Sequence, residues 1–224
     1  MKYLGLSASR VCVGLMDVNA KTKPCLLSCS VLKNELRALV KKGAFDVNLL
    51  FLDMSLHSDY GLLETNLRRT IENLARSHRE VVVVYGDFCL GQESEMKKLM
   101  DEYGVVKVDA LNCIDCLLGG KGKFLEADPR HECLFLSPGW IKYFLHFEEL
   151  TKNGEYEEAF RNMFRGLKGV VLLDSLGNLD NYEKDTEEFR NFTGLQIIER
   201  REVGLENLRR VILEAAKKQS AAAK

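Results

Sequence analysis

Four side chains that bind metals or carry redox chemistry follow four short apolar runs of the sequence. They are Cys29, His57, Cys89 and Cys113, and each lies at or shortly after the end of a run rich in valine and leucine. The carboxyl ends of parallel strands share one edge of a sheet, where open α/β sheets bind ligands. Thiolate and neutral imidazole are donors that suit zinc or iron. The pattern predicts a Cys/His metal site at this edge.

A second cysteine close to Cys113 offers a different chemistry. Cys113 and Cys116 form a C-x-x-C pair in NCIDCLLGG. On a helix the two sulfurs lie about one turn apart, a spacing that serves a metal or a dithiol/disulfide couple. A structural zinc ribbon requires a second C-x-x-C, which this chain lacks. A thioredoxin-like pair would follow the first strand of a small domain, whereas this pair is mid-chain. Burial of Cys116 among Leu117 and Leu118 is the remaining alternative.

The segment around Cys89 is typical of a tight turn that opens a helix. In YGDFCLGQ, Tyr85 and Gly86 end an apolar run, and Gly91 follows the cysteine. A helix N-terminus at this point would stabilise a Cys89 thiolate and lower its pKa. The segment is neither a G-x-G-x-x-G motif nor a P-loop, so it gives little support to nucleotide binding.

Three further residues have both a functional and a structural interpretation. Trp140, in SPGW, walls a pocket at the sheet edge or caps the core. Asp174 ends another apolar run and binds a metal or hydroxyl, or else caps the following helix. Glu35 lies on the helix after Cys29, where it orients a ligand or is a surface charge. There is no nucleophile elbow and no H-E-x-x-H motif.

The elements that must position these residues alternate between strand and helix. Helical periodicity recurs between the apolar runs, as expected where helices cover both faces of a parallel sheet. We therefore expect a single three-layer α/β/α domain over 25–218, with a mostly parallel sheet of about six or seven strands. Residues 1–24 are expected to be an N-terminal extension and residues 219–224 a frayed C-terminus. The expected strands are CLLSC, VNLLFLD, EVVVVYG, VVKV, ECLFLS, GVVLLDS and, at an edge, LQIIE.

Charge and composition exclude several classes of protein. The formal net charge is −1 and the pI is near 6.5, which argues against nucleic acid or anionic membranes as partners. No apolar run approaches the roughly 20 residues that span a bilayer. The first residues lack the uninterrupted apolar stretch of a signal peptide. Seven cysteines, an odd number, favour reduced or metal-bound thiols in a cytoplasmic protein.

Taken together, these motifs resemble the uncharacterised DUF1638 family of archaea and anaerobic bacteria. The resemblance runs from about Cys29 to Ile198 and rests on CSVLKNEL, SLHSDYGLLETNLRRTIE, VVYGDFCLGQ, NCIDCLLGG and SPGW. It implies that the family positions are Cys29 with Glu35, His57, Cys89, Cys113 with Gly119, and Trp140.

The chain departs from the family pattern near two of its cysteines. Asn112 replaces an aspartate, and one extra residue separates Tyr85-Gly86 from Cys89. Cys116 lies outside the pattern, which weakens the C-x-x-C hypothesis.

The resemblance also implies a setting in methylotrophic methanogenesis, beside corrinoid methyltransferases. We expect a metal-binding protein with zinc- or iron-dependent methyl or thiol chemistry linked to corrinoid metabolism. Its partners would be a small-molecule ligand and corrinoid methyltransferase proteins. Two alternatives stay open: a non-catalytic accessory protein that binds a corrinoid or another small molecule, and a thiol–disulfide oxidoreductase that uses Cys113 and Cys116. The expected pocket residues around the metal ligands are Glu35, Tyr85, Gly86, Asn112, Cys116, Trp140 and Asp174.

Overall fold

Seven parallel strands form two separate sheets in the computed structural model, which describes residues 23–76, 80–150 and 157–222. The first sheet has the order β2-β1-β3-β4 and the second the order β5-β6-β7, and every pairing is parallel. The strands are β1 (Cys25–Cys29), β2 (Asn48–Leu52), β3 (Val81–Val84), β4 (Val106–Lys107), β5 (Cys133–Leu136), β6 (Gly169–Asp174) and β7 (Ile197–Glu202).

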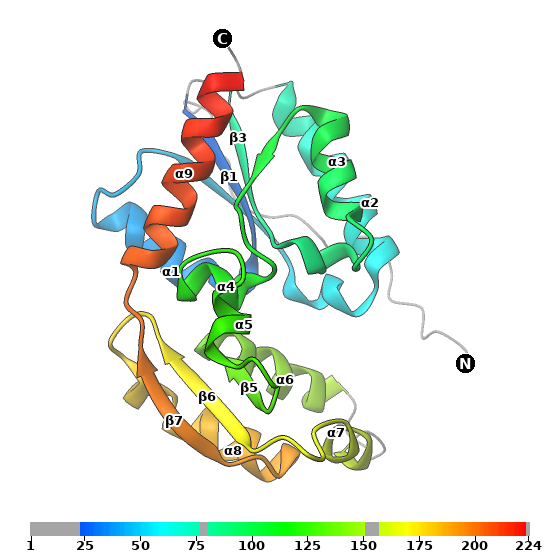
Figure 1. Cartoon of the computed structure of the whole chain (residues 1–224), viewed down its shortest axis with the longest axis vertical. Helices are drawn as coiled ribbons and strands as arrows, with labels where there is room; N and C mark the ends of the chain where they lie inside the picture. Colours follow the sequence, from blue (N-terminus) through cyan, green and yellow to red (C-terminus); the bar gives the residue numbers. More distant parts are fainter. Residues whose placement is uncertain (1–22, 77–79, 151–156, 223–224) are drawn as a thin grey trace.

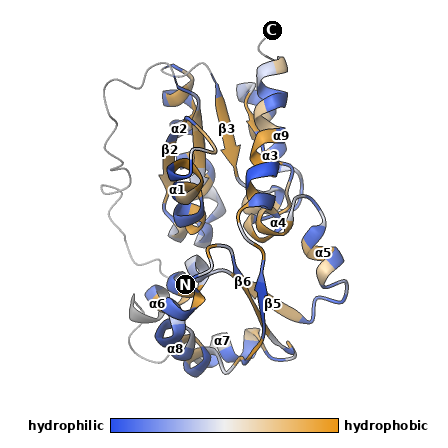
Figure 2. Cartoon of the chain, turned by 90° about the vertical axis from the view of Figure 1, so that its left-hand side faces the viewer, coloured by the Kyte–Doolittle hydropathy of each residue, from blue (hydrophilic) through white to orange (hydrophobic). Residues whose placement is uncertain are grey.

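The first sheet has helices on both of its faces. In Figure 1, α2 and α3 lie on one side of β1 and β3, and α1 and α9 lie on the other. The helices are α1 (Lys33–Lys41), α2 (Tyr60–Ala75), α3 (Glu95–Tyr103), α4 (Cys113–Leu118), α5 (Lys123–Ala127), α6 (Pro138–Leu150), α7 (Glu157–Met163), α8 (Glu183–Thr193) and α9 (Glu206–Ala222). The valines of β3 are all buried, as a strand covered on both faces requires. Figure 2 shows this strand as a strongly hydrophobic segment between the helices.

The prediction of one sheet with six or seven strands is wrong, although the mixed α/β class and the parallel direction are confirmed. The first sheet stops at β4, which has two residues and therefore offers only a short ladder to a further strand. The next strand, β5, pairs with β6 instead. LQIIE was expected as an edge strand, and β7 is an edge strand that begins two residues later, at Ile197.

One hydrophobic core nevertheless reaches both sheets. Along β6, Val171 and Leu173 join the core of the first sheet, while Val170 and Leu172 face the core under α6 and α8. The alternation follows from the two-residue period of a strand. One face of the second sheet thus contributes side chains to the core that the first sheet shares.

The carboxyl ends of both sheets are directed toward the middle of the molecule (Figure 1). There α6 packs against η1 (Ser30–Leu32), the one-turn 3₁₀ helix that follows β1. The approach is close, because a Cβ atom on Gly139 would lie 2.3 Å from the Val31 carbonyl oxygen. Residues after the strands of one sheet therefore contact residues after the strands of the other.

The described part of the chain begins at residue 23 and ends at residue 222. Most of the expected N-terminal extension, residues 1–22, lies outside the described residues. At the other end α9 runs on to Ala222, past the residue 218 at which fraying was expected. Gln219 is buried there, and its Oε1 accepts a hydrogen bond of 2.7 Å from the Val106 amide at the exposed side of β4. None of the described helices is long and apolar enough to cross a membrane.

Candidate functional site

Cys29 and His57 come together from two neighbouring strands of the first sheet. Cys29 ends β1 and caps η1, where its sulfur accepts a hydrogen bond of 3.5 Å from the Val31 amide. His57 lies in η2 (Met54–Ser58), the 3₁₀ helix that follows β2. Cys29 Sγ and His57 Nδ1 are 3.9 Å apart. The parallel pairing of β1 with β2 brings both turns to the same edge.

The His57 ring has two tautomers with different partners. Its Nδ1 lies 3.3 Å from the Met54 carbonyl oxygen, to which it donates when it carries the proton. With the proton on Nε2, Nδ1 presents a lone pair beside the Cys29 sulfur. Burial lowers the pKa of His57, so that the imidazole is neutral and can act as a ligand.

Cys89 and Cys113 are held by turns that touch each other. Cys89 lies in η3 (Asp87–Leu90), directly after β3, and Cys113 is the first residue of α4. The Asp87 and Phe88 amides donate hydrogen bonds of 2.9 Å to the carbonyl oxygens of Ala110 and Leu111, which joins the two turns. The helix that the sequence predicted at Cys89 is therefore a single 3₁₀ turn.

Trp140 reaches the cluster from the second sheet. It lies in the first turn of α6, and its Nε1–H donates a hydrogen bond of 3.0 Å to Cys113 Sγ. Its ring also meets the His57 ring edge-on, at 6.1 Å between centroids. Both interpretations of Trp140 have contacts that agree with them: it touches Cys113 and His57, and it also packs against the hydrophobic cores of both sheets.

Cys29 and Cys89 are buried, and His57 and Cys113 are partly buried. Burial is the largest influence on each sulfur: it raises the pKa of Cys29 well above its ordinary value, that of Cys89 to about 11 and that of Cys113 to about 12. Cys113 and Cys89 raise the pKa of Cys29 further, and Cys89 raises that of Cys113. These mutual effects place the three sulfurs within electrostatic range of one another. We call Cys29, His57, Cys89 and Cys113 the thiol–imidazole cluster.

Hydrogen-bond donors directed at the sulfurs oppose the effect of burial. The Val31 amide lowers the pKa of Cys29, and the Gly86 backbone lowers that of Cys89. For Cys113 the Trp140 indole and the first amides of α4 act in the same direction. The site thus contains hydrogen-bond donors for three thiolates, although the thiols keep their protons unless a metal ion replaces them. Within the described residues, no three His, Cys, Asp or Glu side chains already have the spacing that holds a metal ion.

Tyr85 was predicted only as a pocket residue, and it lies against the cluster. Its ring stacks on that of His57, with 6.0 Å between centroids and 12° between planes. The residue is buried, and its hydroxyl has no hydrogen-bond partner among the described residues. Burial raises the pKa of Tyr85 well above its ordinary value, and the neighbouring thiols of Cys29 and Cys89 raise it further.

Two other predicted pocket residues make structural contacts: Glu35 at the junction of the two sheets, and Asp174 in the turn after β6. Glu35 is buried rather than a surface charge, and the Ser175 hydroxyl donates a hydrogen bond of 2.8 Å to its carboxylate. Asp174 accepts hydrogen bonds from the backbone amides of residues 176–178, so it caps the turn after β6. It does not cap the following helix, as one of its two interpretations predicted, because η4 begins only at Leu179.

The remaining predicted residues support the turns that carry Cys89 and Cys113. Gly86 allows the turns to approach, because a Cβ atom there would lie 2.3 Å from the backbone of Leu111 and Asn112. Asn112 caps α4 by accepting a hydrogen bond of 2.9 Å from the Asp115 amide. Cys116 lies on this helix and is buried in the core, 1% exposed.

The sequence analysis missed Asp115 and Tyr143. Asp115 is fully buried, and its carboxylate accepts backbone hydrogen bonds that hold the turn around Cys113. The signal was present, since Asn112 and Asp115 have the spacing of a capping box. The Tyr143 ring packs edge-on against the Trp140 ring, with 5.5 Å between centroids. Tyr143 follows Trp140 by three residues, so their proximity on one face of a helix could have been predicted from the sequence.

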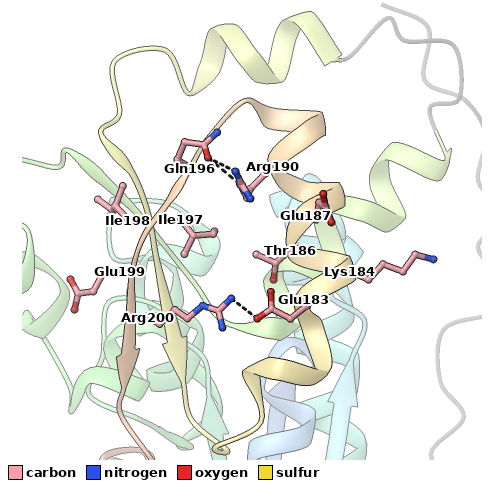
Figure 3. Close-up of a pocket in the computed structure, with 10 residues that line it drawn as sticks. All are labelled: Glu183, Lys184, Thr186, Glu187, Arg190, Gln196, Ile197, Ile198, Glu199 and Arg200. Carbon is pink, nitrogen blue, oxygen red and sulfur yellow. Dashed lines mark hydrogen bonds and ion pairs between the residues drawn. The ribbon is translucent and has the colours of Figure 1, made fainter.

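A charged groove elsewhere on the molecule is separate from this cluster. Figure 3 shows it between α8 and β7, lined by residues such as Glu183, Arg190 and Arg200. Two of its arginines have partners within the groove: Arg200 forms an ion pair with Glu183, and Arg190 donates hydrogen bonds to Gln196. No thiol lines it.

Comparison with known proteins agrees with the motifs around the cluster. No curated protein and no solved structure matches the chain. A family model does match, over residues 51–212, a range that includes His57, Cys89, Cys113 and Trp140 but not Cys29. The family is described as "Protein of unknown function (DUF1638)", which confirms the resemblance drawn from the motifs. The chain is a member of the DUF1638 family.

Proposed function

We propose that the protein binds zinc or iron through Cys29, His57, Cys89 and Cys113. The observation that carries the proposal is the separation of 3.9 Å between Cys29 Sγ and His57 Nδ1. Zinc bonds of about 2.3 Å to sulfur and about 2.0 Å to nitrogen, at a tetrahedral angle, imply a separation of about 3.6 Å. One metal ion could therefore join these two atoms with only a small movement.

The surroundings of the sulfurs support the same proposal. Each of the three thiols receives N–H donors from nearby backbone or indole groups. Hydrogen bonds of this kind stabilise metal-bound thiolates and tune them. A cation that displaces the thiol protons would also remove the mutual repulsion of three thiolates in a buried site. The neutral imidazole of His57 completes a donor set that suits zinc or iron.

Closing the site around a metal requires rearrangement of Cys89 and Cys113. Rotation of a cysteine side chain between staggered positions moves its sulfur by about 3 Å without moving the backbone. Metal-free sites commonly close only when the ion binds, because binding and local ordering are coupled. The proposal therefore includes a change of side-chain conformation on loading.

The chemistry proposed for the loaded site is methyl or thiol chemistry. Zinc or iron bound by thiolates supplies a Lewis acid toward a thiol or a methyl acceptor. The chain's own part is to exclude water, through burial by both sheets, and to hold the sulfurs in place. A role beside corrinoid methyltransferases remains part of this proposal.

Metal analysis of anaerobically purified protein tests the assignment. After supply of zinc or iron, the wild type should carry close to one metal per chain. Cys89→Ser and Cys113→Ser should lose most of it, because each removes a thiolate ligand. Cys116→Ala is the matched control, since Cys116 is a buried core thiol one helical turn from Cys113. A wild type that binds neither metal would overturn the proposal.

The same variants distinguish the two alternative functions. A thiol–disulfide oxidoreductase would show a reversible two-electron couple that Cys116→Ala abolishes, whereas a metal site should survive that change. An accessory protein that binds a corrinoid would acquire a visible absorption band that persists after the metal is removed. Each result would replace metal binding as the function of the cluster.

A further inference from the structure

Tyr85 has a buried hydroxyl whose partner is missing. The residue follows β3 directly, is 2% exposed, and its hydroxyl has no hydrogen-bond partner among the described residues. Buried polar groups are nearly always paired, so an unpaired one in a native protein calls for an explanation. A phenylalanine would fill the same space without this cost.

The position of the hydroxyl identifies the group that it could serve. Ser28 pairs with Val84 in the β1–β3 register, so Cys29 and Tyr85 leave the two paired strands side by side. The Tyr85 ring is also nearly parallel to the ring of His57, whose Nδ1 lies 3.9 Å from Cys29 Sγ. The Tyr85 hydroxyl and the Cys29 thiol fall short of hydrogen-bond geometry as they stand. A protonated thiol is a weak acceptor, whereas a thiolate accepts a strong, charge-assisted hydrogen bond.

We propose that the Tyr85 hydroxyl donates a hydrogen bond to the Cys29 thiolate once a metal has replaced the thiol proton. Tyr85 is then a positioning residue: it acts on the metal through Cys29 and does not bind the metal itself. The inference rests on the proposed metal site and adds a function for the unpaired hydroxyl. It explains why a buried residue beside the cluster is tyrosine.

This role predicts opposite effects of Tyr85→Phe on the metal-free and metal-loaded protein. Without metal, the variant loses only an unpaired buried hydroxyl, so its melting temperature should rise by about 2–4 °C. With metal, it lacks a hydrogen bond to a ligand, so the dissociation constant should rise about tenfold. A residue with a merely structural role would shift both in the same direction.

Cobalt(II) is the probe for the loaded protein, because its sulfur-to-cobalt charge-transfer band reports on the thiolates. Removing a hydrogen bond from a thiolate raises the energy of its lone pairs, so Tyr85→Phe should move this band to longer wavelength. Tyr103→Phe is the control: Tyr103 bonds to Glu72 on the surface, away from the cluster. Its band and dissociation constant should equal those of the wild type.

The outcomes separate the two proposals. Cobalt binding by the wild type, with an unchanged dissociation constant and band in Tyr85→Phe, would overturn the role of Tyr85 and leave the metal site standing. Failure of the wild type to bind cobalt would overturn both. Two results for Tyr85→Phe together would support the inference: a weaker cobalt complex with a red-shifted band, and a raised melting temperature of the metal-free variant.

Discussion

Asp115 is the residue on which the turn carrying Cys113 depends most. Its carboxylate is fully buried and accepts hydrogen bonds from the Leu111, Gly122 and Phe124 amides, at 2.9, 2.9 and 2.6 Å. Asp115→Asn removes the negative charge and turns an acceptor oxygen into an amide donor that faces backbone N–H groups. We expect a loss of about 2–4 kcal/mol in the free energy of unfolding, measured by urea denaturation.

The control for this variant is Asp109→Asn, an exposed aspartate just before the same turn. A surface substitution of this kind usually changes the free energy of unfolding by less than about 0.5 kcal/mol. Equal stability of the two variants would show that the buried hydrogen bonds of Asp115 contribute nothing net.

Single residues differ in how far the sequence reveals them. The approach of Cys29 to His57 follows from local patterns, because apolar runs mark strands and parallel strands share an edge. Glu35 was expected either to orient a ligand in the pocket or to be a surface charge, and its buried partner, Ser175, is 140 positions away. No local pattern carries such a contact. The capping role of Asn112, in contrast, is local and readable.

Among the structural elements, the contact between the η3 turn and the α4 turn tolerates little change. Gly86 lies in this contact, with Leu111 and Asn112 against its Cα atom. In Gly86→Ala the added methyl would meet backbone, which cannot rotate away as a side chain can. We expect a loss of about 3 kcal/mol in unfolding free energy. The displaced turns should also weaken metal binding, because they carry Cys89 and Cys113.

Gly61→Ala is the matched control for that substitution. Gly61 lies in the first turn of α2, and the nearest atom to an added Cβ is Asp59 Oδ1 at 3.4 Å. Alanine in a helix is favoured over glycine by roughly 0.5–1 kcal/mol, so this variant should equal or exceed the wild type in stability. A neutral Gly86→Ala would refute the tight contact between the turns.

The strands were more predictable than the short helices that hold the cluster. Val and Leu runs mark the strands because buried parallel strands are apolar on both faces. The 3₁₀ helices η1, η2 and η3 contain only three to five residues each. So few residues do not complete a hydrophobic period, and the pattern therefore gave no signal for them.

At the scale of the whole molecule, the division into two sheets changes what encloses the cluster. If the cluster lay at the edge of a single sheet, that sheet would cover the cluster from one side only, and the other side would face solvent or a ligand. Here α6 brings Trp140 from the second sheet onto Cys113 and His57. Strand order depends on which edges pair, and the sequence pattern does not encode that choice. The two-residue length of β4, which ends the first sheet, was likewise not evident from VVKV.

The hydrogen bond between Glu35 and Ser175 joins the two sheets, and it should make stability depend on pH. Burial raises the pKa of Glu35 above its ordinary value, and the Ser175 hydroxyl opposes part of that rise. The folded protein therefore keeps the Glu35 proton at pH values where the unfolded chain has lost it. Because the folded state then binds more protons, its stability falls as the pH increases.

The decline should begin near the ordinary pKa of glutamate, about 4.3, and level off above the raised folded pKa. Urea unfolding of the wild type and Glu35→Gln across this interval measures it: the free-energy difference should shift steadily in favour of the glutamine variant. Ser175→Ala removes the hydrogen bond that lowers the pKa, so its decline should extend to higher pH. A difference that stays constant with pH would mean that the carboxyl has the same pKa in the folded protein as in the unfolded chain, and a shift in favour of the wild type would mean that the folded protein lowers this pKa. The junction between the sheets would then hold a charge, and Ser175 would be stabilising a carboxylate rather than a protonated acid.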